Sequence, residues 1–262
     1  TMGQGGFQEV EQMNLFKDMV CYQEEVRDPS RMAEVLNRVI EKAFRGSAPA
    51  QINVPRDYWT QVIDIELPPI VRFERQGGGK EAIENAAKLL SKAKFPVILS
   101  GAGVVLGGAI DECKKLAEKL DAPVCNGYQH NDSFPGSHPL AVGPLGYNGS
   151  KAAMELISKA DVVLALGTRL NPFSTLPGYG IDYWPKKATI IQVDMNPDRI
   201  GLTKKVSVGI CGDAKQVAQQ ILDKLSSDAG NTGREERKNL IHKTKSCLLY
   251  TSDAADETIC VD

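Results

Sequence analysis

The pattern of hydrophobic and polar positions predicts helices and strands in two regions of the chain. In the first region, Asp28 and Pro29 introduce apolar residues at helical spacing, which predicts a helix that ends at Gly46. A further short helix and two strands are predicted around it, at 11–19, 20–22 and 51–54. Such an arrangement is the end of an α/β layer, so we expect residues 1–64 to be the last part of a domain whose opening strands precede this chain.

The second region is longer and more regular. Residues 65–79 have the proline and glycine content of a linker. Beyond them, helices are predicted at 80–93, 108–120, 150–159 and 213–226, and strands at 95–100, 123–125, 161–166, 189–193 and 206–210. The strands are apolar throughout, which favours a parallel sheet with helices on both faces. The fold class is therefore α/β, with a complete Rossmann-like domain over 80–226.

The pattern weakens after Ser226. Residues 227–262 contain a polar linker and a charged segment without a periodic apolar face, so we expect everything after Asp228 to pack against nothing. The stretch from Cys247 onward resembles the translation of a sequencing adapter, and we interpret it as a non-native tail.

Composition narrows the function classes. The chain has 31 basic and 33 acidic residues, so it lacks the basic excess that favours nucleic-acid binding. No apolar run approaches the roughly 20 residues that span a bilayer, and no signal-peptide pattern is present, so we expect a cytoplasmic protein. The six cysteines form no CxxC pair and the three histidines show no ligand spacing. We expect buried, reduced thiols and no metal site on these residues.

Candidate ligand contacts follow the predicted strands. Gly101 and Gly103 lie between a strand and a helix, where a phosphate would meet helix amides. The spacing is one residue longer than GxGxxG, and no acidic residue ends the next strand, so a tight turn is the favoured interpretation. Gly167, Arg169 and Asp194 follow two later strands; Arg169 could face a phosphate and Asp194 a ribose, but a solvated arginine and a loop cap are equally consistent.

Two further motifs involve polar side chains near glycines. Asp213 and Asn239 mimic the spacing of a magnesium–diphosphate motif, but the residue after Asp213 is not glycine and a helix follows directly. We therefore interpret Asp213 as a helix cap. Residues 3–9 (GQGGFQE) place Phe7 and Gln8 beside three glycines, which predicts either close backbone approach to a ligand or a plain flexible loop.

Taken together, these landmarks resemble the thiamine-diphosphate carboligase and decarboxylase family. The matching segments run in order from Gly3 to about Leu225, and they are residues 5–9 (GGFQE), 54–57 (VPRD), 160–167 (ADVVLALG), 192–194 (QVD) and 209–213 (GICGD). The resemblance implies the C-terminal part of a pyrimidine-binding domain followed by a whole central domain. It also implies thiamine diphosphate and Mg in the complete enzyme, a small-molecule substrate, and a homo-oligomer with neither nucleic-acid nor membrane partners.

Within the family, three segments differ from acetolactate synthases: residues 3–13, 145–151 and 171–180. The sequences of these segments are similar to those of members that convert sulfoacetaldehyde and phosphate to acetyl phosphate and sulfite. The resemblance therefore implies a fragment of an acyltransferase of sulfonate metabolism, and we expect the fragment alone to be inactive. The resemblance implies that Phe7 and Gln8 reach the reaction. Arg56 could face a sulfonate or phosphate, although a surface salt bridge is favoured.

Two other functions stay open from sequence. One is an acetolactate-synthase-like carboligase, and the other is a non-catalytic nucleotide-binding module. Relatives hold FAD or ADP in the central domain, where Gly101, Gly103, Gly167, Arg169 and Asp194 would lie; we do not expect a nucleotide here.

Overall fold

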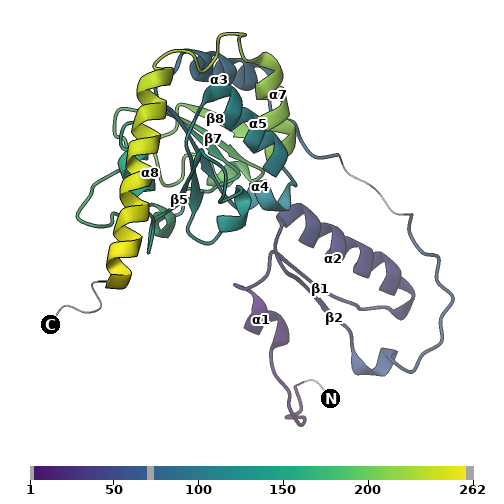
Figure 1. Ribbon diagram of the computed structural model, residues 1–262. Helices are drawn as coiled ribbons and strands as arrows, with labels where there is room; N and C mark the ends of the chain where they lie inside the picture. Colours follow the sequence, from purple (N-terminus) through teal and green to yellow (C-terminus); the bar gives the residue numbers. More distant parts are fainter. Residues whose placement is uncertain (1–2, 70–73, 258–262) are drawn as a thin grey trace. The chain divides into compact units, whose positions relative to one another are not determined.

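The computed structural model describes residues 3–69 and 74–257, with side chains described as far as Ser246 (Figure 1). The chain divides into two compact units, Thr1–Phe73 and Glu74–Asp262. We call them the amino-terminal unit and the carboxy-terminal unit.

The amino-terminal unit is a single β-α-β element with short helical additions. Its elements are α1 (Gln12–Phe16), β1 (Tyr22–Glu25), η1 (Pro29–Arg31), α2 (Met32–Gly46), β2 (Ala50–Asn53) and η2 (Arg56–Tyr58). The strands are parallel, and α2 packs on them through a small core of Val26, Val35 and Val39. Asp28 caps the first turn as expected, accepting the Ser30 N–H at 2.9 Å, but that turn is a 3₁₀-helix. The helices and strands predicted here are present, with β1 beginning at the last residue of the predicted strand.

The carboxy-terminal unit is built on a six-stranded, fully parallel sheet. Its strands are β3 (Pro96–Ser100), β4 (Val124–Gly127), β5 (Ala141–Leu145), β6 (Val162–Leu166), β7 (Thr189–Asp194) and β8 (Val208–Cys211), in the spatial order β5-β4-β3-β6-β7-β8. The helices are α3 (Lys80–Lys92), α4 (Ala102–Leu106), α5 (Ile110–Leu120), α6 (Lys151–Ile157), α7 (Ala214–Lys224) and α8 (Arg234–Glu257), with short 3₁₀ turns η3 (Asn131–Ser133), η4 (Pro172–Thr175) and η5 (Pro197–Arg199).

Helices cover both faces of this sheet, as the sequence predicted. Helix α7 packs against both α3 and α5, and α6 packs against α8. Figure 1 shows α3, α5 and α7 grouped together and α8 apart from them. Every residue of β3 and of β6 is buried, because these two strands lie in the middle of the sheet with neighbours on both sides. The predicted parallel α/β architecture is confirmed.

Strand β5 lies in a stretch that the sequence pattern assigned to a long loop. It contains Gly143, at φ +91°, and Pro144, and its pairing with β4 shifts register between Val124 and Cys125. Proline is tolerated in an edge strand because the missing N–H can face away from the ladder. The sequence pattern hid this strand since glycine and proline normally indicate a loop.

The prediction that everything after Asp228 packs against nothing is wrong for the residues whose side chains are described. Ala229 and Ile241 belong to the main core, and Arg237 is fully buried. Arg237 donates five hydrogen bonds to backbone carbonyls, those of Lys94, Leu120, Asp121, Gly230 and Thr232. The sequence pattern did not predict this packing because the residue that holds the segment in place is Arg237. A charged residue is taken as a surface residue when hydrophobic periodicity is analysed. The side chains of Leu248, Leu249 and Tyr250 lie outside the described residues.

The compact unit also begins before the predicted helix at residue 80. Arg75 forms an ion pair with the buried Asp213 at 2.8 Å, and the carbonyl of Gln76 accepts the Asp213 N–H at 2.8 Å. Residues 74–79, which have the composition of a linker, are thus attached to the start of α7. The carboxy-terminal unit is longer at both ends than residues 80–226.

Candidate functional site

The topology of the sheet singles out one edge. From β3 the chain moves outward to β4 and β5, then returns to the other side of β3 and continues through β6, β7 and β8. The direction of strand order therefore reverses between β3 and β6. In open parallel sheets, ligands bind outside the carboxyl ends of the strands at such a switch point.

The structure brings the predicted nucleotide-site residues to this edge. Gly101 follows β3, Gly167 and Arg169 follow β6, and Asp194 ends β7, which are three adjacent strands. The sequence prediction that they share one edge agrees with the structure. What they do there depends on their contacts.

The glycines are used to pack the two crossover loops against each other. The Gly101 N–H donates to the Leu166 carbonyl at 3.1 Å, and the Gly103 N–H donates to the Gly167 carbonyl at 2.8 Å. A Cβ on Gly103 would lie 2.7 Å from the Gly167 Cα, and Gly167 itself has φ +62°. Only glycine fits at this junction, because backbone occupies the space of a side chain on either loop.

This packing does not fit a phosphate cradle. The amides of Gly101 and Gly103 already have backbone acceptors, and the helix behind them, α4, has only five residues. A helix terminus binds an anion through amides that lack partners, and here those two are paired. The contacts therefore support the tight-turn interpretation of Gly101 and Gly103.

The polar residues beside the junction differ in their partners. Arg169 is exposed and makes no ion pair within residues 3–69 and 74–246. Asp194 is buried, with 8% of its surface exposed, and its Oδ1 accepts the Asn196 N–H at 2.9 Å. Asp194 therefore acts as a loop cap, which was one of the two interpretations left open for it.

Sequence reasoning missed Gln192, which organises this edge. Gln192 is buried in β7, its amide donates to the carbonyls of Thr168 and Arg199, both at 3.1 Å, and its carbonyl accepts the Gly201 N–H at 2.9 Å. It joins the loops that follow β6 and β7. The available signal was a polar side chain inside an otherwise apolar strand, because buried amides are retained where their hydrogen bonds are satisfied.

The two segments that differ from acetolactate synthases in the central region contact each other. The rings of Tyr147 and Phe173 lie 5.4 Å apart, and the Tyr147 N–H donates to the Phe173 carbonyl at 3.2 Å. The Tyr179 hydroxyl donates to the Gly149 carbonyl at 3.1 Å. Residues 145–151 and 171–180 thus form one composite surface beside the carboxyl edge of the sheet.

In the amino-terminal unit, the predicted catalytic residues are all at the surface. Phe7 is 94% exposed, Gln8 has φ +62°, and Arg56 is exposed at the start of η2. The salt bridge favoured for Arg56 does not form with any residue in the described part of the chain. Neither a hydrogen bond nor an ion pair joins Arg56 to the loop of residues 3–9 within that part.

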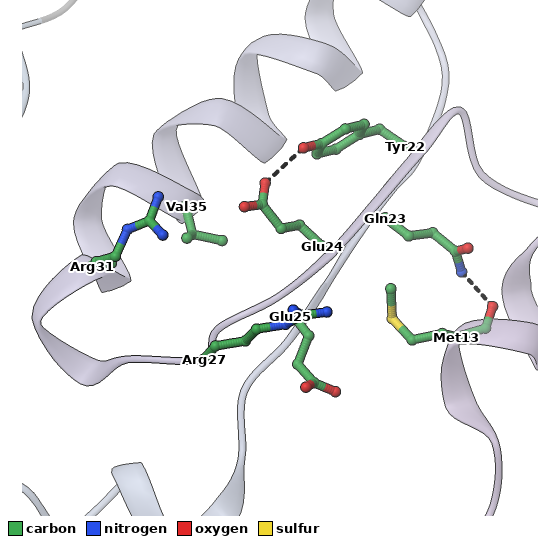
Figure 2. A pocket seen from close by; sticks show the side chains of 8 residues that line it. All are labelled: Met13, Tyr22, Gln23, Glu24, Glu25, Arg27, Arg31 and Val35. Carbon is green, nitrogen blue, oxygen red and sulfur yellow. Dashed lines mark hydrogen bonds between the residues drawn. The ribbon is translucent and has the colours of Figure 1, made fainter.

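A cavity of about 450 Å³ in this unit lies along β1 and contains none of these three residues (Figure 2). Its lining is polar: the Gln23 amide donates to the Met13 carbonyl at 2.6 Å, and the Tyr22 hydroxyl donates to Glu24 at 2.7 Å. Hydrogen bonds from Arg38 hold the pKa of Glu24 at about 2. Tyr22, Gln23 and Glu24 thus already have protein partners, and the lining of the cavity does not include Phe7, Gln8 or Arg56.

The expectations about metals and thiols concern both units. Asp213 caps α7 by accepting the N–H groups of Lys215 and Gln216 at 3.1 and 3.2 Å, so the helix-cap interpretation is confirmed. Within the described residues, no cluster of three histidine, cysteine or acidic side chains could hold a metal ion, and no helix is long and apolar enough for a membrane span.

The described cysteines are free thiols in different environments. Cys113 and Cys125 are buried, and burial raises the pKa of Cys113 to about 12. Cys21 is exposed and Cys211 is partly exposed, so the expectation of buried thiols is correct for two of these residues and wrong for Cys21.

Comparison with known proteins places this fold in a family. Residues 83–221, more than half of the chain, match the family described as "Thiamine pyrophosphate enzyme, central domain". The chain belongs to this family, as the sequence motifs indicated. The match covers the sheet from α3 to α7 and therefore includes the switch point and its glycine junction.

Individual relatives show which members of the family the chain resembles. The chain is 77% identical to the "Probable sulfoacetaldehyde acetyltransferase" of Rhizobium meliloti and 79% identical to the "Sulfoacetaldehyde acetyltransferase" of Roseovarius nubinhibens, in each case over 98% of this chain. It is 34% identical, over 86% of the chain, to the "Probable acetolactate synthase large subunit" of Methanocaldococcus jannaschii. The chain spans 43%, 42% and 39% of the lengths of these three relatives.

A solved structure supports the fold alone. Benzoylformate decarboxylase from Polynucleobacter necessarius superposes with a TM-score of 0.73 at 23% identity, over 86% of this chain and 42% of that one. The chain therefore shares its fold with part of that longer protein.

Proposed function

We propose that this chain is part of a thiamine-diphosphate-dependent acyltransferase that converts sulfoacetaldehyde and phosphate to acetyl phosphate and sulfite. The observation that carries the proposal is the identity of 77–79% over 98% of the chain to two proteins named for this activity. The matched stretch of 256 residues takes in both segments of the composite surface, and an acetolactate synthase relative is only 34% identical.

The amino-terminal unit would be the last part of the pyrimidine-binding domain. This is supported by its parallel β-α-β element and by an apolar stripe on α2 that faces away from the small core, formed by Leu36, Ile40 and Phe44, which are 43%, 45% and 81% exposed. Apolar stripes of this width usually pack against another element. In a longer protein, further strands and helices would cover it.

Within the complete enzyme, residues of this chain would act on the substrate and would not take part in activating the cofactor. When bound, thiamine diphosphate supplies the carbanion and the electron sink. The Gln8 amide would donate a hydrogen bond to the substrate oxygen as negative charge develops on it, and Phe7 would exclude water. Arg56, exposed and without an ion pair in the described chain, would pair with the sulfonate or with phosphate through its planar guanidinium.

Several properties of the whole enzyme are part of the same proposal. They are magnesium as the metal that holds the diphosphate, a homo-oligomeric assembly, and a cytoplasmic role in sulfonate metabolism. Since the chain spans less than half of the length of its relatives, residues outside it would complete the active site. We therefore expect this chain alone to release no sulfite.

The proposal is tested in the complete enzyme with thiamine diphosphate and Mg. Wild type should release sulfite from sulfoacetaldehyde only when phosphate is present, and should form no acetohydroxy acid from pyruvate. Gln8→Ala should lower kcat about 10²-fold with the melting temperature unchanged, because an oxyanion donor acts in the transition state. Gln4→Ala, in the same loop, is the matched control and should have wild-type kcat.

The outcomes separate the alternatives. Pyruvate turnover together with bound yellow flavin would favour an acetolactate-synthase-like carboligase. Absence of both reactions would favour a non-catalytic nucleotide-binding module. A Gln8→Ala variant that melts early but turns over normally would leave the family assignment intact and remove Gln8 from the active site.

A further inference from the structure

The glycine-rich loop of residues 3–9 is closed by the carboxylate of its own last residue. One carboxylate oxygen of Glu9 accepts the N–H of Gly3, and the other accepts the N–H of Gly6 at 2.9 Å. The backbone N–H of Glu9 also donates to the Gly6 carbonyl, at 3.1 Å. A single side chain thus joins the start and the middle of the loop to its end.

The conformation held in this way is one that the chain rarely adopts unaided. Gly3 and Gly5 have φ of +77° and +70°, and Gln8, which carries a side chain, has φ +62°. A left-handed conformation at a residue other than glycine carries a strain that the surrounding structure must offset. Core packing cannot offset it here, because residues 3–11 are exposed.

The charge state of Glu9 agrees with this role. The N–H groups of Gly3 and Gly6 lower the pKa of Glu9 below its ordinary value. The side chain is therefore a carboxylate at neutral pH, and hydrogen bonds to an ionised acceptor are stronger than neutral ones. Neutral pH is thus the condition under which the loop is closed.

We propose that Glu9 is the positioning residue of this loop: its carboxylate holds Gly3 and Gly6 so that Gln8 keeps its left-handed backbone and the loop presents Phe7 and Gln8 to the substrate. This rests on the proposed function, in which Gln8 acts on the substrate oxygen. Glu9 itself does not touch the substrate. Its effect on the reaction passes entirely through the residues that it positions.

The test is a double-mutant cycle in the complete enzyme, with sulfite release as the activity. Glu9→Ala should lower kcat by about 10- to 100-fold with little change in KM, because the geometry of the transition state is affected more than binding. Glu9→Gln keeps one acceptor oxygen and should lose less. Glu11→Ala is the matched control, since Glu11 makes no capping hydrogen bond with its side chain and should keep wild-type kcat.

The cycle decides whether Glu9 acts through Gln8. The double variant Gln8→Ala/Glu9→Ala should be no slower than Gln8→Ala alone, because a positioning residue has no effect once the group that it positions is gone. Equal fold losses from Glu9→Ala in the wild-type and Gln8→Ala backgrounds would overturn the proposal. So would a Glu9→Ala variant with wild-type kcat.

A second measurement does not depend on activity. Amide hydrogen exchange, followed by mass spectrometry on the peptide that covers residues 3–9, should be faster in Glu9→Ala than in wild type and unchanged in Glu11→Ala. Unchanged exchange in Glu9→Ala would refute the closed loop even in an inactive enzyme. If the wild-type enzyme releases no sulfite but Glu9→Ala still exchanges faster than wild type, then the proposed function has failed and the loop is nevertheless closed as described.

Discussion

The two units of this chain contain the same kind of element, a parallel strand–helix–strand, yet they bury it to different extents. In the carboxy-terminal unit, six strands are paired side by side and helices cover both faces, so β3 and β6 are wholly buried. In the amino-terminal unit, β1 and β2 are partly exposed along their whole length, and the core consists of three valines. A sheet of only two strands offers too little surface to form a large core with the helix that packs on it.

The difference between the two units separates residues that stabilise the fold from residues that are available for function. The carboxy-terminal unit uses its conspicuous glycines and buried polar groups for packing: Gly103 contacts backbone, and Gln192 satisfies its own hydrogen bonds. The amino-terminal unit leaves Phe7, Gln8 and Arg56 at its surface, where they are available to a ligand. Exposed polar and aromatic side chains on a loop are the stronger functional signal, since buried ones are already committed to the fold.

The largest expected effect in this comparison concerns Arg237. Arg237→Met should destabilise the carboxy-terminal unit by about 3–5 kcal/mol, because five backbone carbonyls lose a shared donor inside the core. Urea unfolding followed by Trp184 fluorescence, in a Trp59→Phe background, measures the change. Lys243→Met, at an exposed position of the same helix, is the control and should alter stability by less than about 0.5 kcal/mol. An equally small effect of Arg237→Met would mean that α8 does not stabilise this unit.

A smaller effect is expected at the glycine junction. Gly103→Ala should cost about 1–3 kcal/mol, because its Cβ would lie 2.7 Å from the Gly167 Cα and the two loops would have to separate. Gly136→Ala is the control, since a Cβ there would have no neighbour within 4 Å. The same fluorescence assay compares them. If the two substitutions cost the same, then the junction is not a tight contact between the two loops.

The smallest effect concerns acid, and it should appear in the amino-terminal unit. Arg38 lowers the pKa of Glu24 to about 2, from an ordinary value near 4.5, so this pair stabilises the fold above pH 4.5 and is lost as the pH falls toward 2. The side chains are 35% and 23% exposed, so the contribution is no more than about 1 kcal/mol.

Trp59 fluorescence in a Trp184→Phe background, recorded from pH 5 to pH 2, should show the amino-terminal unit unfolding first. Glu24→Gln should flatten that pH dependence, whereas Glu25→Gln, on the same strand, should leave it as in wild type. Simultaneous acid unfolding of both units would contradict the idea that their cores differ in stability.

Much of the fold could be predicted from the sequence, and the failures have physical causes. The central strands were found because apolar runs such as 162–166 stay apolar on both faces of a parallel sheet. Strand β5 was missed because it is an edge strand with Gly143 and Pro144 in it, and α8 because its anchor is Arg237 rather than an apolar stripe. At the candidate site, the position of Gly101, Gly167 and Asp194 on one edge was predictable, but their partners were not.

The sequence by itself determined the class of fold, the order of its main elements and the family, since hydrophobic periodicity and short motifs are properties of neighbouring residues. Only the tertiary structure decided what the motif residues do. Gly103 and Gly167 are 64 positions apart along the chain, and they meet because β3 and β6 are adjacent in the sheet. Arg237 reaches the carbonyls of Lys94 and Leu120 because these residues precede β3 and β4, which are also adjacent in the sheet. Whether a glycine cradles a ligand or packs against backbone depends on what lies across from it, and that is set by the pairing of distant strands.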